Sequence, residues 1–306
     1  MTATIIDGRK IADTLRAQVA AEARMLAAGG IPCGVATVTV GNDYASRSYV
    51  SRLKRVGGQL GVRHQAINLP ADTTQGTVRD MLARLNADQS VSGILILRPL
   101  PPHLDEADVF QELSPGKDIE AVHQDNAGLL ALGRPRYLPS TPASAFHVLD
   151  GWLDEAGEDR AGFYHRSLIV VVGRSANVGK PAVSLAYDRQ AAVESIDIWA
   201  SRAGRLGWHT RRADVLVVAA GVPGLIRSEH VKEGAIVLDI GINPQTDPVT
   251  GRTRVVGDVD FDDVVTRARA ITPVPGGVGP VTDVWLIRNT VAAARNIAAS
   301  SPTEQR

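Results

Sequence analysis

A glycine-bearing turn that follows the most apolar run of the chain has the composition of a phosphate-binding loop. The run SLIVVV at 167–172 predicts a buried parallel strand, and GRSANVGKP at 173–181 leads from it into a predicted helix over 178–190. Glycine at such a turn lets the backbone approach a pyrophosphate, and the amino end of the helix offers free N–H groups. Because the spacing from Gly173 to Gly179 is G-x5-G rather than G-x-G-x-x-G, an ordinary strand-to-helix turn stays open as the alternative.

Two arginines and a serine near this turn favour NADP over NAD. An NAD site typically carries an acidic residue at the end of the second strand, where it binds the ribose hydroxyls. The predicted strand at 194–199 leads instead to Ser201 and Arg202, and Asp197 is expected inside the strand, where it is a poorer ribose ligand. Arg174, Ser201 and Arg202 together suit a 2′-phosphate. The alternative is that both arginines are solvated surface charges.

The composition is that of an ordinary globular protein and argues against several classes of function. The 306 residues are 44% hydrophobic and 22% charged, which argues against wholesale disorder. Lys+Arg and Asp+Glu are both 33, so no basic excess points to nucleic acid or to an anionic membrane. No apolar run is long enough to span a bilayer and no signal peptide is evident, so we expect a cytoplasmic protein.

The sequence predicts neither a disulfide nor a metal site. Cys33 is the single cysteine. The acidic run at 258–263 begins like a calcium loop, but Asp263 stands where such a loop needs glycine at its sixth position. The seven histidines show no H-x-x-x-H pattern, so we expect no metal.

Strand and helix patterns alternate along most of the chain. Strands are predicted at 32–40, 91–97, 167–172, 194–199, 214–219 and 235–239. Helices are predicted from Gly8 to about Gly29 and at 44–60, 74–87, 104–113, 143–157, 178–190, 260–268 and 283–299, with a loop at 271–280. This alternation implies two units of parallel sheet with helices on both faces and a cleft between them, where ligands usually bind.

Eight blocks of sequence together carry a resemblance to one family. They are YVSRLK at 49–54, GILILRPLP at 93–101, PGKDIEAVHQDNAG at 115–128, PSTP at 139–142, GRSANVGKP at 173–181, DIGIN at 239–243, VVGDVDF at 255–261 and ITPVPGGVGPVT at 271–282. In this order and spacing the chain resembles the bifunctional methylenetetrahydrofolate dehydrogenase/methenyltetrahydrofolate cyclohydrolase family over nearly its whole length.

The resemblance implies a fold and a domain organisation. It implies two three-layer α/β domains, the second a Rossmann-like NADP-binding domain, with a folate cleft between them. The folate-binding catalytic domain would comprise residues 1–142 and 283–300, the NADP-binding domain would comprise 143–282, and 301–306 would be a disordered tail. It also implies a homodimer.

The matching positions imply where the ligands bind. Those expected to bind NADP are Gly173, Arg174, Ser175, Ser201 and Ile242, with Arg202 as the second cation. Tyr49 matches the tyrosine that stacks on or borders the pterin of a folate. Pro275, Gly276 and Gly277 match the loop that closes over the folate.

Two catalytic positions of the family are replaced by leucine. The family has Tyr-x-x-x-Lys, which places phenol and amine on one helix face, but the fourth residue after Tyr49 is Leu53. Lys54 stands next to it, about 140° around the helix from Tyr49 at about 100° per residue. The glutamine that precedes L-P-L-P in the family is replaced by Leu97. The family's proton-handling pair is therefore expected to be an apolar wall here.

At a third catalytic position the negative charge is kept, but it is carried by a longer side chain. The family's aspartate in V-D-G is Glu120 in this chain, and the glycine is Ala121. One extra methylene moves the carboxylate by about 1.5 Å. We expect Glu120 to contact the substrate, the alternative being a solvated loop glutamate.

The family's two reactions need different protein groups. Oxidation of 5,10-methylenetetrahydrofolate moves a hydride to the nicotinamide and depends mainly on positioning. Hydrolysis of the resulting methenyl cation needs proton transfers, typically worth 10²–10⁴-fold. The leucines therefore predict an NADP-dependent dehydrogenase with lost or weak cyclohydrolase activity. Three alternatives stay open: a bifunctional enzyme that uses Tyr49 or Lys54 as its base, a paralogue acting on a modified folate or another one-carbon adduct, and a folate- or NADP-binding protein without turnover.

Overall fold

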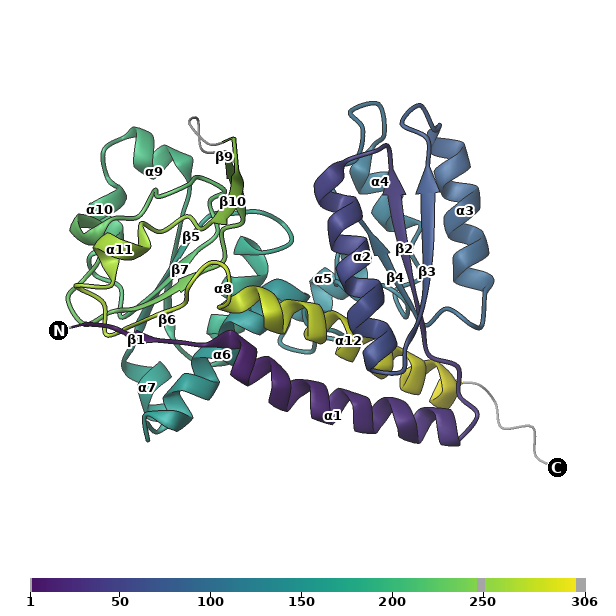
Figure 1. The fold of residues 1–306 in the computed structure, drawn as a ribbon, viewed down its shortest axis with the longest axis horizontal. Helices are drawn as coiled ribbons and strands as arrows, with labels where there is room; N and C mark the ends of the chain where they lie inside the picture. Colours follow the sequence, from purple (N-terminus) through teal and green to yellow (C-terminus); the bar gives the residue numbers. More distant parts are fainter. Residues whose placement is uncertain (1, 247–250, 301–306) are drawn as a thin grey trace. The chain divides into compact units, whose positions relative to one another are not determined.

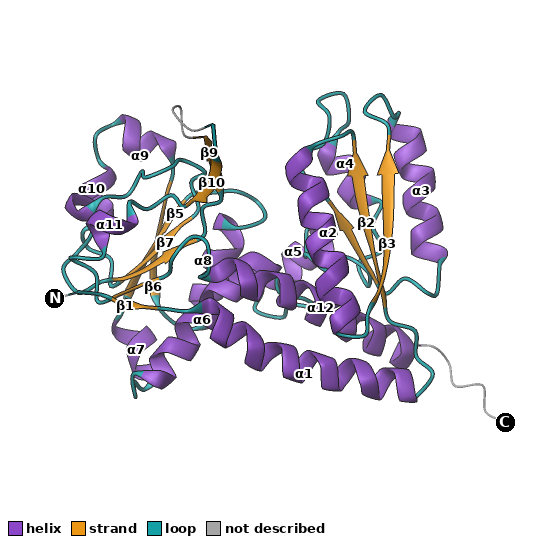
Figure 2. Cartoon of the chain, viewed as in Figure 1, coloured by secondary structure: helices purple, strands orange, loops and turns teal. Residues whose placement is uncertain are grey.

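The chain folds into two compact units. The computed structural model describes residues 2–246 and 251–300. One unit, here the six-stranded domain, comprises the described residues up to Asp13 and those from Thr141 to Thr282. The other, here the three-stranded domain, comprises Thr14–Ser140 and the described residues from Asp283 onward. Each contains a parallel sheet and helices, which confirms the predicted two-domain α/β fold (Figures 1 and 2).

The six-stranded domain contains most of the carboxyl-terminal half of the chain. Its strands are β1 (Thr4–Ile5), β5 (Leu168–Val172), β6 (Ala192–Ile196), β7 (Val215–Val218), β8 (Ile236–Asp239), β9 (Asn243–Thr246), β10 (Thr253–Val256) and β11 (Ala270–Ile271). Its helices are α7 (Arg160–Arg166), α8 (Gly179–Asp188), α9 (Ile198–Arg202), α10 (Leu206–Thr210), α11 (Phe261–Val264) and the short 3₁₀ helix Ser228–His230. Three further helices cross the division between the two units: α1 (Gly8–Ala28), α6 (Ser140–Glu155) and α12 (Val278–Ser300).

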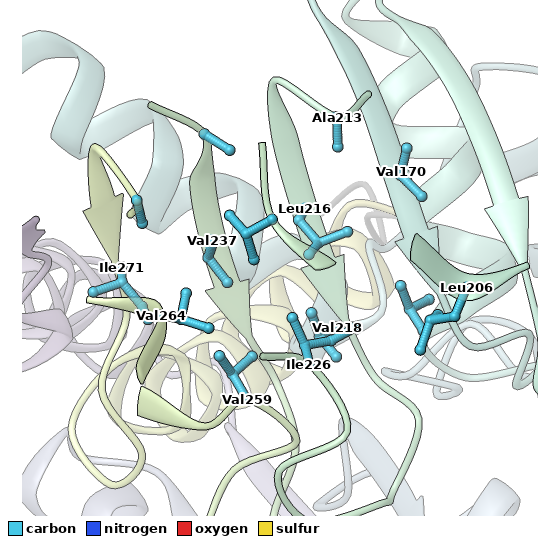
Figure 3. Close-up of a cluster of buried hydrophobic side chains, with 14 of the residues drawn as sticks. Val170, Leu206, Ala213, Leu216, Val218, Ile226, Val237, Val259, Val264 and Ile271 are labelled. Carbon is cyan, nitrogen blue, oxygen red and sulfur yellow. The ribbon is translucent and has the colours of Figure 1, made fainter. Parts of the chain in front are cut away.

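The main sheet of this domain is parallel throughout. Its order is β1-β11-β8-β7-β5-β6, and β9 and β10 form a separate antiparallel pair. The apolar residues of β5, β7 and β8 pack into one buried cluster with residues from α10, α11 and the intervening loops (Figure 3). Val170, Leu216 and Val237 lie on adjacent strands in this cluster and are at most 1% exposed. Strands buried in this way fix the loops at their carboxyl ends, where ligands bind in parallel sheets.

The first residues of the chain belong to the six-stranded domain rather than to the predicted domain 1–142. The reason is the pairing of β1 with β11, which aligns Thr4 with Ala270 and Ile5 with Ile271. The amide of Ile6 also donates to the carbonyl of Ile271. A two-residue strand shows no periodicity, so its pairing was not visible in the sequence.

The three-stranded domain has a smaller parallel sheet. Its strands are β2 (Gly34–Val40), β3 (Arg63–Leu69) and β4 (Gly93–Ile96), in the order β3-β2-β4. Its helices are α2 (Tyr44–Gln59), α3 (Gln75–Ala87), α4 (Glu106–Gln111) and α5 (Gln124–Ala131), together with the parts of α1 and α12 that lie in this domain. A buried cluster that includes Val38, Leu82 and Ile94 joins β2, α3 and β4. This core fixes the loop after β4. Helix α2, which carries Tyr49, contacts β2 and β3 with residues outside this cluster.

Several details of the structure differ from the sequence prediction. Strand β6 ends at Ile196, so Asp197 follows the strand instead of lying within the predicted strand 194–199. The reason is that the Asp197 carboxylate caps α9 by accepting a hydrogen bond from the Trp199 amide. Helix α12 begins at Val278, inside the predicted loop 271–280. Strand β3 was not predicted, and the tail 301–306, predicted to be disordered, lies outside the described residues.

Candidate functional site

The cofactor loop connects β5 to α8 as the sequence predicts. Gly173 has φ +117°, and a Cβ built on it would lie 2.1 Å from the carbonyl oxygen of Ala219, so only glycine fits there. The Ser175 hydroxyl accepts a hydrogen bond from the Gly179 amide, which fixes the start of α8. Within the described chain, the backbone N–H groups of residues 174–178 donate to no other protein atom. These free donors suit the pyrophosphate of a dinucleotide.

The residues expected at the 2′-phosphate lie at the carboxyl end of β6. The Arg174 guanidinium donates to the Ser195 carbonyl at 2.8 Å and contacts the Asp197 carboxylate at 3.2 Å. Arg202 is exposed, and its guanidinium lies 4.9 Å from the centre of the Trp199 ring. Arg174 therefore offsets the charge of Asp197, while the charge of Arg202 stays exposed next to Ser201.

Two buried carboxylates hold the neighbouring loops, and the sequence reasoning gave them no role. Asp239 accepts hydrogen bonds from the amides of Gly241, Asp258 and Val259. Asp258 in turn accepts from the amides of Ala220 and Gly221 and from the Asn243 side chain. This network fixes the turn after β8 that presents Ile242, whose side chain is 64% exposed. Asp258 is thus a loop anchor, and no group of His, Cys, Asp and Glu residues within 2–246 and 251–300 is arranged to hold a metal ion.

The loop predicted to close over the substrate is tied to the start of α1. The Gly8 amide donates to the Gly276 carbonyl at 3.0 Å, and the Gly277 amide donates to the Pro273 carbonyl at 2.7 Å. A Cβ on Gly8 would lie 1.7 Å from the Gly277 oxygen, so the two backbones are in direct contact. Pro275 follows a cis peptide bond and is exposed. Pro275, Gly276 and Gly277 lie in the six-stranded domain, whereas Tyr49 and Glu120 lie in the three-stranded domain.

Helix α2 positions Tyr49, the tyrosine predicted to border the substrate. Asp43 caps the helix by accepting a hydrogen bond from the Ser46 amide at 2.7 Å. The buried face carries Val50, Leu53 and Val56, at the spacing of an amphipathic helix. Leu53, the position predicted to correspond to the family lysine, is completely buried and faces the interior of this domain. Tyr49 is partly buried, and burial together with the charges of Asp283 and Glu120 raises the pKa of its phenol.

Lys54 lies outside the buried face of α2 that contains Leu53. It is exposed on α2. Burial, and to a smaller extent the charge of Lys54, lowers the pKa of the His64 imidazole on β3. Leu97 directly follows β4, where its amide donates to the Val38 carbonyl, and it is partly exposed. Neither Leu53 nor Leu97, the positions predicted to correspond to the family's lysine and glutamine, carries a group that can transfer a proton.

Glu120 lies in a loop whose backbone is held from several sides. The buried Asp118 accepts hydrogen bonds from the amides of Val122 and His123 and from the Asn126 side chain. The side chain of Asn289 on α12 donates to the carbonyl of the residue just before Glu120. Such a framework orients a side chain without relying on the substrate to do so.

The carboxyl group of Glu120 is partly buried and has a perturbed acidity. One oxygen accepts a hydrogen bond from the Ser140 amide at 3.2 Å. Burial, and to a smaller extent Asp118, raises the pKa of Glu120 to about 7, against the opposing effects of Ser140 and Arg98. Ala121 has φ +52°, a left-handed conformation that costs a residue with a side chain roughly 1–3 kcal/mol. Strain and a shifted pKa at adjacent positions are typical of a functional site.

The sequence reasoning missed two residues beside Tyr49. Arg52 lies one helical turn further along α2, and its guanidinium is 4.9 Å from the centre of the Tyr49 ring. Its Nε lies 2.8 Å from the carboxylate of Asp283 on α12. The i, i+3 spacing from Tyr49 could have indicated Arg52, but no local pattern indicates Asp283.

The six-stranded domain has the cofactor loop of a dinucleotide-binding domain, and the second α/β domain carries a tyrosine and a carboxylate. This combination is typical of a two-domain, dinucleotide-dependent oxidoreductase. Comparison with known families places it more closely. "Tetrahydrofolate dehydrogenase/cyclohydrolase, catalytic domain" matches residues 6–120, and "Tetrahydrofolate dehydrogenase/cyclohydrolase, NAD(P)-binding domain" matches residues 139–298. The chain belongs to this family of methylenetetrahydrofolate dehydrogenases/cyclohydrolases, which confirms the predicted family and the nicotinamide dinucleotide cofactor.

Individual relatives agree with this assignment. "Bifunctional protein FolD 3" of Rubrobacter xylanophilus is 56% identical over 302 residues, covering 98% of this chain and 95% of the relative. The methylenetetrahydrofolate dehydrogenase-cyclohydrolase of Trypanosoma brucei, solved with NADP cofactor and an inhibitor, has a TM-score of 0.89 at 32% identity, covering 98% of this chain and 100% of the other. The NAD-dependent 5,10-methylenetetrahydrofolate dehydrogenase of Saccharomyces cerevisiae shares the fold, with a TM-score of 0.78 at 19% identity, covering 98% and 99%.

Proposed function

We propose that this protein oxidises 5,10-methylenetetrahydrofolate with NADP and has little or no cyclohydrolase activity. The observation that supports the proposal most directly is the complete burial of Leu53 at the position of the family lysine. A leucine has no proton to transfer, and Leu97 likewise replaces the family glutamine. The predicted cleft, the homodimer and the cytoplasmic location stay predictions.

The residues that remain are sufficient for hydride transfer. Bound NADP would supply the hydride acceptor, and the folate nitrogen next to the methylene bridge supplies the electron density as the hydride leaves. We assign to Tyr49 the stacking of the pterin and to Glu120 a hydrogen bond to its ring. Gly173, Ser175 and the free amides of 174–178 would hold the pyrophosphate. Positioning of this kind is the main contribution of the protein to the rate of a hydride transfer.

The proposed activity is tested by following NADPH and the methenyl product in one reaction. With 5,10-methylenetetrahydrofolate and NADP, we expect NADPH to form and methenyltetrahydrofolate to accumulate in equal amount. Supplied separately, methenyltetrahydrofolate should disappear at close to its rate in buffer alone. Hydrolysis that keeps pace with NADPH formation would contradict the loss of cyclohydrolase activity. Binding of NADP and tetrahydrofolate without NADPH would contradict the dehydrogenase activity and favour a binding protein, whereas NADPH formation only with another one-carbon adduct would favour a specialised paralogue.

We propose that Arg202 selects NADP over NAD. Arg174 is occupied by Asp197 and Ser195, so Arg202 is the cation at the end of β6 that is left to meet a 2′-phosphate. A charge-assisted hydrogen bond of about 1.5–3 kcal/mol corresponds to roughly ten- to a hundred-fold in affinity. We therefore expect Arg202→Ala to raise the KM for NADP at least about tenfold and to leave that for NAD unchanged.

The control for this prediction is Arg205→Ala. Arg205 is an exposed arginine three residues further along the chain, and its removal changes the net charge of the domain equally. The KM values of both variants are measured by steady-state kinetics with each cofactor. If Arg202→Ala changed the KM values for NADP and NAD equally, the guanidinium would not contact the 2′-phosphate.

A further inference from the structure

The side chain of Arg52 is held between a ring and a carboxylate. Its guanidinium carbon lies 4.9 Å from the centre of the Tyr49 ring, and its Nε lies 2.8 Å from Oδ2 of Asp283. Tyr49 and Arg52 are three residues apart on α2, so they share one face of the helix. Two contacts from two helices thus fix a cation directly beside the residue that is expected to border the pterin.

Asp283 is a firm anchor for this cation. Its side chain is only 8% exposed, and its Oδ1 accepts no hydrogen bond from a described residue. Burial raises the pKa of Asp283, and Arg52 opposes this more than the neighbouring Arg16 and Arg55 do. If Arg52 moved away, a buried carboxylate would lose its main counter-charge, which is strongly unfavourable. The ion pair therefore keeps the guanidinium against Tyr49.

The position of Arg52 limits what Tyr49 can do. A guanidinium over one face of the ring leaves the other face for a stacked ligand and hinders rotation of the ring. Unlike an amine, a guanidinium stays protonated in proteins, so it contributes charge but no proton transfer. The charged groups around the phenol are Arg52, Asp283 and Glu120, and all lie in the three-stranded domain.

We propose that Arg52, anchored by Asp283, is a positioning residue that fixes the Tyr49 ring for a folate-type substrate and supplies a permanent positive charge beside that ring. The inference rests on the proposed function and deepens it. A fixed cation together with a fixed ring favours binding and orientation, which hydride transfer needs. Neither the guanidinium nor the fixed ring supplies the proton-transferring group that hydrolysis of the methenyl compound needs.

The proposal is tested with variants that keep the domain folded. Arg52→Ala alone leaves Asp283 unpaired, so the main test is the double variant Arg52→Gln, Asp283→Asn. It removes both charges, keeps the volume of the Asp283 side chain and leaves a shorter, polar side chain at position 52. We expect its KM for 5,10-methylenetetrahydrofolate to rise about tenfold, with kcat changed less than threefold and the KM for NADP unchanged. Arg52→Lys, which keeps the charge without the planar group, should raise the folate KM about threefold. Lys54→Ala removes an exposed cation from the same helix and should have no effect.

A further measurement shows whether Arg52 acts through Tyr49. In a Tyr49→Leu background there is no ring to position, so the double substitution should add no further increase in KM. A wild-type folate KM in the double variant, or a full additional increase in the Tyr49→Leu background, overturns the proposal.

Direct titration with tetrahydrofolate separates this proposal from the proposed activity. If the wild-type protein binds tetrahydrofolate and the double variant binds it about tenfold more weakly, the role of Arg52 stands even if no NADPH forms. If the wild-type protein does not bind tetrahydrofolate, or if both proteins bind it equally, the role of Arg52 is refuted.

Discussion

The double substitution Leu53→Lys, Leu97→Gln is expected to raise the rate of methenyltetrahydrofolate hydrolysis about 100-fold over the wild-type protein. Proton transfer by a positioned side chain contributes typically 10²–10⁴-fold, and the lower end suits an engineered amine. Leu53 is completely buried, and Arg52 lies next to it on α2. Burial and a neighbouring cation both lower the pKa of an introduced amine, which brings it closer to the range in which it exchanges protons at neutral pH. Absorbance of the methenyl group follows the hydrolysis directly.

The matched control is Leu53→Met, Leu97→Gln, which fills the same space without an amine and should show no gain. The lysine variant should be less stable by a few kcal/mol because it buries a polar group. Its NADPH-forming rate is therefore measured in the same preparation, to show that the domain is folded and binds its substrates. A folded lysine variant that forms NADPH but hydrolyses the methenyl compound no faster than the methionine control would show that the amine is not the missing component.

The parts of this protein that the sequence predicted well are those whose signals are local. Helix α2 and strand β5 agree with prediction to within a residue or two, because a continuous apolar face or run determines each one. The glycine turn after β5 could be predicted because Gly173 directly follows this apolar run. Strand β3 was missed because it is an edge strand with exposed polar residues at several positions, such as Arg63 and Gln65.

The parts that escaped prediction depend on contacts between distant residues. Asp197 was placed inside a strand because the apolar pattern of SIDIW continues past it, whereas its side chain caps a helix. The pair of Arg52 and Asp283 joins α2 to α12, and no spacing along the chain connects them. The sequence predicted which catalytic groups the site lacks, whereas the cation beside Tyr49 is seen only in the structure.

Replacement of Glu120 by glutamine is expected to lower kcat/KM for 5,10-methylenetetrahydrofolate about ten- to a hundred-fold at pH 8. A carboxylate hydrogen bond to a substrate N–H is worth about 1.5–3 kcal/mol, and the neutral amide keeps the shape but not the charge. Because the pKa of Glu120 is raised to about 7, the wild-type carboxyl is mainly ionised at pH 8 and mainly neutral at pH 6. Wild-type kcat/KM should therefore fall as the pH drops through about 7, and the difference between wild type and Glu120→Gln should shrink with it. The Glu22→Gln variant removes the same charge from a partly exposed carboxylate on α1 that pairs with Arg295, and it should leave the profile unchanged.

The stability of Glu120→Gln at pH 8 should change in the direction opposite to its activity. The folded-state pKa of Glu120 lies above its ordinary value of 4.5, so the folded protein binds a proton that the unfolded chain releases between these two values. The contribution of Glu120 to the free energy of unfolding is therefore largest below about pH 4.5 and is lost as the pH rises through about 7. Glu120→Gln carries no such ionisation, so at pH 8 it should unfold at higher denaturant concentration than the wild type although it is the poorer enzyme. Equal stability of the two proteins from pH 5 to pH 8 would mean that Glu120 is a solvated loop residue, and its assignment to the substrate site would then fail.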